Sequence, residues 1–263
     1  MKIALCLSGY LRSFKECYPS ILENVIQDHD VDIFIHTYDK MGESKGWKHT
    51  QTGEILNEPV RENPIELGYA EFRPIYNELI DLNFLQNIPQ VKVVAVERLQ
   101  DIKYKFKNLV GNVSIFSNID EIACILYKIC ECNNLRKQYE LENHITYDLV
   151  IRTRGDQIFT KKINYNFPKE KILVNAYPWG DQDYIINDGG EDVCVSDRFA
   201  VGTPDNIDYL SDLYLHLNEL FERHPITCSP IEFLVKYHLE GKIELEKRFL
   251  GFYVKHKPQR FKQ

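Results

Sequence analysis

The sequence of 263 residues lacks several features that mark particular classes of protein. No apolar run approaches the ~20 residues of a membrane-spanning helix. The opening stretch, MKIALCLSGYLRSF, has neither the longer apolar run nor the small-residue cleavage site of a secretory signal. The formal net charge of -7 lacks the positive excess that broad nucleic-acid binding needs. We therefore expect a soluble, cytoplasmic protein with no nucleic-acid partner.

The cysteines lack the spacing of a metal site or of a disulfide framework. There are seven, an odd number, and no two of them form a CxxC pair. Cys124, Cys130 and Cys132 fall within a stretch of helical periodicity. We expect reduced cysteines buried in the core, because free cysteine behaves as a small apolar side chain.

Segments with the pattern of strands and segments with the pattern of helices alternate along the first two-thirds of the chain. Short apolar runs predict strands at 2–7, 31–36, 91–96, 148–153, 171–176 and 198–201, and a strand or extended chain at 243–254. Helices are predicted at 18–27 and 68–79, from a cap at Ser117 or Asn118 to about 140, and from a capping box at 229–232 to a residue before Gly241. The polar, patternless stretch 38–64 predicts a long loop.

This alternation is typical of an α/β fold in which helices flank a mostly parallel sheet. The length, the hydrophobic share of 44% and the lack of repeats or low-complexity linkers indicate a single domain over 1–263. In an open parallel sheet, ligands bind beyond the carboxyl ends of the strands. Polar residues at those ends are therefore the candidates for a functional site.

The stretch YDLVIRTRGDQIF, at 147–159, begins as a buried strand and then runs into two arginines and an aspartate. If the chain stays extended, their spacing of two places Arg152, Arg154 and Asp156 on one face. Guanidinium groups grip phosphate or carboxylate bidentately, and the aspartate can hold a divalent cation or a ribose hydroxyl. The alternative is an internal Arg–Asp cluster that only orders the loop.

Two further strand ends carry candidates at the same edge. Ser8, Gly9 and Arg12 follow the first strand, where free amides and an arginine suit an anion. Thr37 and Tyr38 end the second strand, where they can bond to a nucleobase and stack on it. No GxGxxG motif and no GKS or GKT is present. The alternatives are a plain strand–helix corner with a surface arginine, and ordinary polar capping of a strand end.

Three residues outside these stretches are also candidates. Lys128 interrupts an apolar helix stripe, so it either extends to solvent, the usual case for a helix lysine, or reaches a phosphate. Asp197 directly precedes a predicted strand and can act as a general base, contact a sugar hydroxyl or serve as a turn residue. Glu232 is the third residue after Ser229, and the capping box alone accounts for it.

Five stretches together carry a resemblance to a known family. LSGYLRSF, DIFIHTYD, YDLVIRTRGDQIF, SDRFAVG and SPIEFLVKYHL occur in this order. The arrangement resembles the GT-A-fold glycosyltransferases that build surface and capsular glycans in bacteria and some large viruses. The resemblance implies a GT-A-like, Rossmann-like domain with a nucleotide-binding part at about 1–156 and an acceptor-side part at about 157–254. The basic tail at 255–263 is expected to be loose and to allow at most peripheral membrane contact.

The resemblance also implies substrates and residue roles. The donor would be a nucleotide-diphosphate sugar of the UDP or GDP type, and the acceptor a glycan or glycolipid. The donor-binding residues would be Ser8, Gly9, Arg12, Thr37, Tyr38, Lys128, Arg152, Arg154 and Asp156. For a transfer that inverts configuration, Asp197 is the first choice as general base and Glu232 the second.

One departure from the family pattern concerns the metal. Many GT-A enzymes carry Asp-x-Asp at the donor motif and bind ribose and a metal there. This sequence has Arg154-Gly155-Asp156 in that place, with one carboxylate. Asp156 is therefore the one candidate ligand for Mn or Mg, and the arginines can neutralise the leaving diphosphate in place of a metal.

Two other functions fit the same architecture. A sugar-phosphate nucleotidyltransferase usually has a glycine-rich loop after its first strand, whereas LSGYLRS is poor in glycine. A non-catalytic nucleotide- or glycan-binding protein on the same fold agrees with the single carboxylate of the donor motif. Transfer or hydrolysis of a labelled sugar nucleotide separates these functions.

Overall fold

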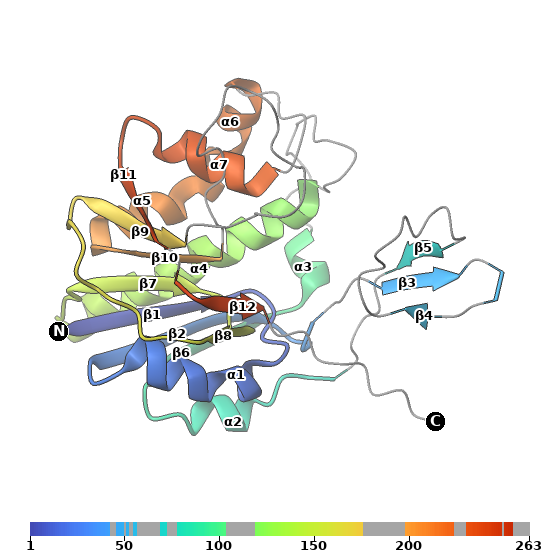
Figure 1. Cartoon of the computed structure of the whole chain (residues 1–263), viewed down its shortest axis with the longest axis horizontal. Coiled ribbons are helices and arrows are strands. Elements are labelled where there is room, and N and C mark those ends of the chain that lie inside the picture. Colours follow the sequence, from blue (N-terminus) through green and yellow to red (C-terminus); the bar gives the residue numbers. More distant parts are fainter. Residues whose placement is uncertain are drawn as a thin grey trace.

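The centre of the molecule is a seven-stranded sheet with helices on both faces (Figure 1). The structure is a computed structural model, and it describes residues 1–42, 46–49, 51–52, 55–56, 69–72, 78–103, 119–175, 198–223, 230–248 and 250–254. The strands of this sheet lie in the order β11-β9-β10-β7-β1-β2-β6. Their bounds are β1 (Lys2–Ser8), β2 (Asp30–Tyr38), β6 (Val91–Glu97), β7 (Leu149–Thr153), β9 (Lys171–Asn175), β10 (Phe199–Gly202) and β11 (Glu244–Arg248).

The sheet is mostly parallel, as the alternation of strands and helices predicts. β1 pairs in parallel with β2 and β7, β2 with β6, and β9 with β11. β10 runs antiparallel to both of its neighbours, β7 and β9. Each of the six shorter predicted strands is confirmed within two residues, and the stretch 243–254 contains β11 and β12 (Phe252–Val254).

Both faces of the sheet are buried, which parallel strands require. Along β1, Ala4 and Cys6 belong to one core cluster, while Leu5 and Leu7 belong to the other. The first face is covered by α4 (Ile119–Asn143), α5 (Pro204–Ser211), α6 (Leu217–Arg223) and α7 (Pro230–Leu239). The second is covered by α1 (Phe14–Ile21) and α2 (Leu82–Gln86). The remaining elements are η1 (Leu22–Ile26), α3 (Leu99–Lys103), β8 (Gln157–Phe159), which pairs with β12, and η3 (Asp212–His216).

The first helix begins earlier than the pattern predicts. α1 starts at Phe14 rather than at residue 18, and the π-helical turn η1 then carries the chain to Gln27, which has φ +52°. The prediction placed Pro19 in the first turn, where its missing N–H costs nothing. In the structure Pro19 lies inside α1, because Phe14 and Cys17 are buried and extend the helix toward its N-terminus.

Two predictions for the segment after β2 are wrong. The stretch 38–64, expected as a loop, contains the strands β3 (Gly46–His49) and β4 (Ile55–Leu56). The stretch 68–79, expected as a helix, contains β5 (Tyr69–Phe72). β3 pairs antiparallel with both β4 and β5 in a separate small sheet (Figure 1). These strands depend on pairing between distant segments, which the local periodicity of each segment does not carry.

Near the C-terminus, one predicted helix is confirmed and other predictions fall outside the described residues. α7 begins at Pro230 and ends at Leu239, before Gly241, as predicted. The proposed caps at Ser117, Asn118 and Ser229, and the basic tail 255–263, lie outside the described residues. Cys6, Cys17, Cys124, Cys130 and Cys132 are buried free thiols, as expected for core cysteines. Among the described helices, none is long and apolar enough to cross a membrane.

The sheet core gives a direct test of this architecture. Leu5 is fully buried on β1, whereas Leu141 on α4 is 76% exposed. Leu5→Ala should lower the free energy of unfolding by about 2–5 kcal/mol, because it leaves a cavity between the sheet and its helices. Leu141→Ala should change it by less than about 0.5 kcal/mol. Urea denaturation of the two variants measures both values, and equal losses would contradict the placement of β1 at the centre of the sheet.

Candidate functional site

The candidate site lies at one edge of the sheet, where four parallel strands end. β1, β2, β6 and β7 run in the same direction, so their carboxyl ends meet at this edge (Figure 1). Ser8 is in register with His36, Leu7 with Thr153, and Tyr38 with Glu97. The predicted residues that follow β1, β2 and β7 are therefore brought to one place.

At this edge, two arginines share one aspartate. Arg154 donates from Nε to Asp156 Oδ1 at 2.9 Å and from Nη2 to Oδ2 at 2.7 Å. Arg12, 144 residues away in the sequence, donates from Nη1 to Oδ2 at 3.1 Å. The Asp156 side chain is 0% exposed, whereas those of Arg12 and Arg154 are 21% and 25% exposed. We call these three residues the arginine–aspartate cluster.

A glycine allows the two chain segments of the cluster to meet. β7 ends at Thr153, and the chain turns at Gly155 and Asp156. A Cβ atom on Gly155 would lie 2.9 Å from Leu11 Cδ2 and 3.3 Å from Phe14 Cδ2, so any other residue there would require these side chains to shift. The absence of that atom lets the turn after β7 lie against the loop after β1.

The turn separates Arg152 from the other two residues of its motif. Arg152 is a buried β7 residue in register with Cys6 and Ala200, both of which belong to the core under α4. The spacing of two predicted that Arg152, Arg154 and Asp156 share one face of an extended strand. That prediction is wrong, because the strand ends before Arg154 and the alternation of side chains ends with it.

The cluster carries more positive than negative charge. Two guanidinium groups and one carboxylate sum to a charge of +1. The pKa of the Arg12 guanidinium is lowered, first by burial and then by the nearby charge of Arg154, although Asp156 acts in the opposite direction. The nearby charge of Arg154 thus disfavours the charged form of Arg12, and a bound anion would favour it.

The arrangement does not fit a metal ion at Asp156, the one candidate ligand in the sequence. Both carboxylate oxygens already accept hydrogen bonds from guanidinium groups, and the side chain has no exposed surface. A divalent cation prefers several free oxygen ligands. Within the part of the chain that the structure describes, no group of three or more His, Cys, Asp or Glu side chains is placed to hold a metal ion.

The loop after β1 differs from its predicted role in one respect. Ser8 is buried, and its Oγ has no hydrogen-bond partner among the described residues. The amide of Gly9 donates to the His36 carbonyl at 3.1 Å, and the amide of Arg12 donates to the Met41 carbonyl at 2.8 Å. These two amides are hydrogen-bonded within the fold and are not open to an anion, whereas the Arg12 side chain is partly exposed.

Of the two tyrosines that pack together at this edge, Tyr10 is partly exposed and Tyr38 is buried. The sequence predicts that Thr37 and Tyr38 contact a nucleobase. Both are buried, so neither is open to one. Tyr10 is partly exposed and packs on Tyr38 with 4.2 Å between ring centroids. The Arg12 guanidinium lies 5.8 Å from the Tyr10 ring. Tyr10 is not among the residues predicted for the site, although an aromatic residue directly after Ser8-Gly9 is itself a signal.

Lys128 does not extend to solvent, contrary to the usual behaviour of a helix lysine. It is fully buried and donates from Nζ to the Thr37 carbonyl at 2.8 Å and to Glu97 Oε2 at 3.1 Å. Glu97 also lies 3.1 Å from His36 Nε2 and accepts from the Tyr127 hydroxyl at 3.2 Å. This network fastens α4 to the ends of β2 and β6, and it satisfies the buried charge of the lysine.

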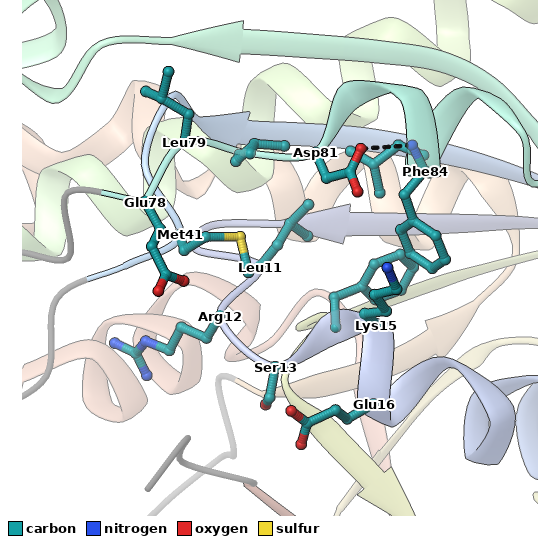
Figure 2. A pocket seen from close by; sticks show the side chains of 13 residues that line it. Leu11, Arg12, Ser13, Lys15, Glu16, Met41, Glu78, Leu79, Asp81 and Phe84 are labelled. Carbon is teal, nitrogen blue, oxygen red and sulfur yellow. Dashed lines mark hydrogen bonds between the residues drawn. The ribbon is translucent and has the colours of Figure 1, made fainter. Parts of the chain in front are cut away.

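A pocket of about 230 Å³ lies beside the arginine–aspartate cluster. Figure 2 shows Leu11 and Met41 at its centre, Phe84 on one side, and the side chains of Arg12 and Glu78 on the other. Its walls come from the loop after β1, the start of α1, Met41, and the segment that leads into and through α2. Arg12 thus belongs both to the cluster and to the wall of this pocket.

The two predicted general bases cannot be placed at the site. Asp197 lies outside the described residues. Glu232 falls in the first turn of α7, but the position of its side chain is not among those described. Both stay predictions from the sequence.

Comparison with known proteins assigns no family: no family model and no curated protein matches the chain. The chemistry of the site is therefore what bears on function.

Replacing Asp156 tests how much the arginine–aspartate cluster contributes to the stability of the fold. Asp156→Asn leaves two arginines without their shared counter-charge. Removing one partner of a buried ion pair costs about 3–5 kcal/mol, and partial exposure of the arginines reduces this to about 2–3 kcal/mol. The matched control is Asp101→Asn, which breaks the exposed pair between Arg98 Nε and Asp101 Oδ2 at 2.7 Å.

The control should cost less than about 1 kcal/mol, because exposed pairs contribute little. Thermal and urea denaturation of both variants at neutral pH give the comparison. A cost for Asp156→Asn no larger than that for Asp101→Asn would show that the buried cluster does not hold the two loops together.

Proposed function

We propose that the chain is a glycosyltransferase that moves a sugar from a nucleotide-diphosphate sugar to a glycan or glycolipid acceptor. The observation that carries the proposal is the arginine–aspartate cluster, in which Asp156 fixes Arg12 and Arg154 at the carboxyl edge of a mostly parallel sheet. Ligands of open α/β sheets bind at this edge. The order of the sequence stretches that resemble GT-A enzymes is consistent with the same reaction.

The diphosphate group of the donor matches the charge and shape of the cluster. A guanidinium has five N–H donors, and Arg12 gives one hydrogen bond to Asp156. Both arginines keep part of their surface toward solvent. Arginine binds phosphate oxygens through two parallel N–H groups, which fixes the orientation of the bound group as well as its position.

The nucleoside would lie against Tyr10. This ring is partly exposed, is backed by the buried Tyr38, and has the Arg12 guanidinium beside it. A base that stacks on Tyr10 would therefore have its diphosphate close to Arg12. Base–aromatic stacking contributes about 1–3 kcal/mol, and it is tolerant of base identity because every base has an aromatic face.

Transfer would proceed by displacement at the anomeric carbon. The acceptor hydroxyl oxygen attacks that carbon, and the bond between the carbon and the diphosphate oxygen breaks. The electron pair of that bond leaves with the nucleoside diphosphate, while the acceptor proton passes to a base. Asp197 or Glu232 would take this proton if configuration inverts. Arg12 and Arg154 would stabilise the charge that grows on the diphosphate, which is the part of the substrate whose charge changes most.

Turnover of labelled sugar nucleotides tests the proposal. UDP- and GDP-sugars, incubated with the protein and a mixed glycan or glycolipid acceptor, should release nucleoside diphosphate. Arg154→Gln should lower kcat at least ~100-fold, since it removes charge stabilisation from the leaving group. Arg223→Gln, which breaks an exposed pair with Glu219 on α6, serves as the control and should keep wild-type turnover. Release of no nucleoside diphosphate from any sugar nucleotide would contradict a transferase.

Tyr10→Leu tests the position of the nucleoside. Leucine keeps an apolar side chain over Tyr38 but removes the aromatic face. The affinity for UDP or GDP should fall about 5-fold or more, whereas inorganic pyrophosphate, which has no base, should bind as it does to the wild type. Isothermal titration calorimetry measures both. An equal loss for pyrophosphate would mean that Tyr10 acts only by supporting Arg12.

A further inference from the structure

The arginine–aspartate cluster has the hydrogen-bonding polarity of an anion site. Three N–H groups converge on the two oxygens of Asp156, and no surface of that carboxylate is exposed. A divalent cation that bound either oxygen of Asp156 would have to compete with a guanidinium group that already donates to it. The outer surface of the cluster consists of arginine, which offers donors and no acceptor.

The fold fixes Arg12 before any ligand arrives. Its backbone takes the unusual value φ +38°, and its amide donates to the Met41 carbonyl at 2.8 Å. A Cβ atom on Gly42 would lie 2.7 Å from Arg12 Cγ, so the arginine stem packs directly on the backbone of Gly42. A side chain held in this way loses little conformational entropy when it binds a ligand.

Arg154 is fixed from the other side. It forms two hydrogen bonds to Asp156, only two residues further along the chain. The turn that carries both residues is locked against Leu11 and Phe14 at Gly155. The two guanidinium groups therefore stand in a set geometry at the Asp156 carboxylate.

We propose that the arginine–aspartate cluster is a diphosphate-binding site that works without a divalent cation. In it, Asp156 is a buried counter-ion that orients Arg12 and Arg154 and does not bind metal. The ligand class is a diphosphate group, either free pyrophosphate or the diphosphate of a nucleotide. That this group belongs to a sugar donor rests on the proposed function; the anion site itself does not.

Calorimetric titration of inorganic pyrophosphate into the full chain, in buffer with EDTA, tests this inference. Wild type should bind, and Arg154→Gln should weaken binding about 10-fold or more, because a hydrogen bond to a charged group is lost. Arg154→Lys keeps the positive charge but loses the planar guanidinium that binds phosphate bidentately. Its affinity for pyrophosphate should therefore lie between those of the wild type and Arg154→Gln. Arg223→Gln is the control and should bind as wild type does. Thermal denaturation checks that each variant is folded. Arg154→Lys also keeps the charge of the cluster, so a loss of affinity in this variant does not come from a change in charge.

Several results would overturn the inference. These are no pyrophosphate binding in EDTA, binding that begins only when Mn²⁺ is added, or equal affinity in wild type and both Arg154 variants. A parallel turnover assay with UDP- and GDP-sugars separates this inference from the proposed function. If pyrophosphate binds in EDTA but no sugar nucleotide is consumed, the transferase proposal fails and the anion site stands. If sugar nucleotides are consumed only with Mn²⁺, the transferase stands and metal independence fails.

Discussion

The arrangement of the candidate site depends on one interaction, the burial of the Asp156 carboxylate between two arginines. This contact joins the loop after β1 to the turn after β7, two segments that are far apart in the sequence. Burying a carboxylate is costly unless it is paired and hydrogen-bonded, and here three N–H groups meet that requirement. Gly155, which has no Cβ atom, lets the turn after β7 pack closely on Leu11 and Phe14. The position of each guanidinium then follows from the position of the carboxylate.

Two further sets of contacts lie at this edge. Lys128 and Glu97 fasten α4 to the ends of β2 and β6, and the ring centroid of Tyr38 lies 4.6 Å from Lys128 Nζ. Tyr10 packs on Tyr38, and both Tyr10 and the Arg12 side chain are partly exposed. The partly exposed surface therefore includes an aromatic ring beside a guanidinium group. This combination suits a nucleoside diphosphate, in which an aromatic base and an anionic group are joined.

Much of the sheet could be predicted, because each central strand is a buried apolar run whose period appears in its own residues. The segments 38–64 and 68–79 could not, since their strands exist only through pairing with one another. At the site, the sequence indicated the ends of β1, β2 and β7, and because these strands are parallel, their carboxyl ends lie together. It misplaced Arg152 because periodicity does not say where a strand stops. It misjudged Lys128 because only tertiary contact reveals a buried partner for a lysine.

The most direct test of the account is whether the cluster binds a diphosphate. Thermal denaturation of the full chain in EDTA, with UDP and GDP compared with uridine and guanosine, addresses this without knowledge of the sugar or the acceptor. At 100 times its dissociation constant, a ligand adds about 2.7 kcal/mol of stability, which is readily measured as a higher Tm. The account predicts a rise in Tm with at least one diphosphate and little or none with the matching nucleoside. No rise with either diphosphate would contradict it, and would leave the cluster as an ion-pair lock that holds two loops together.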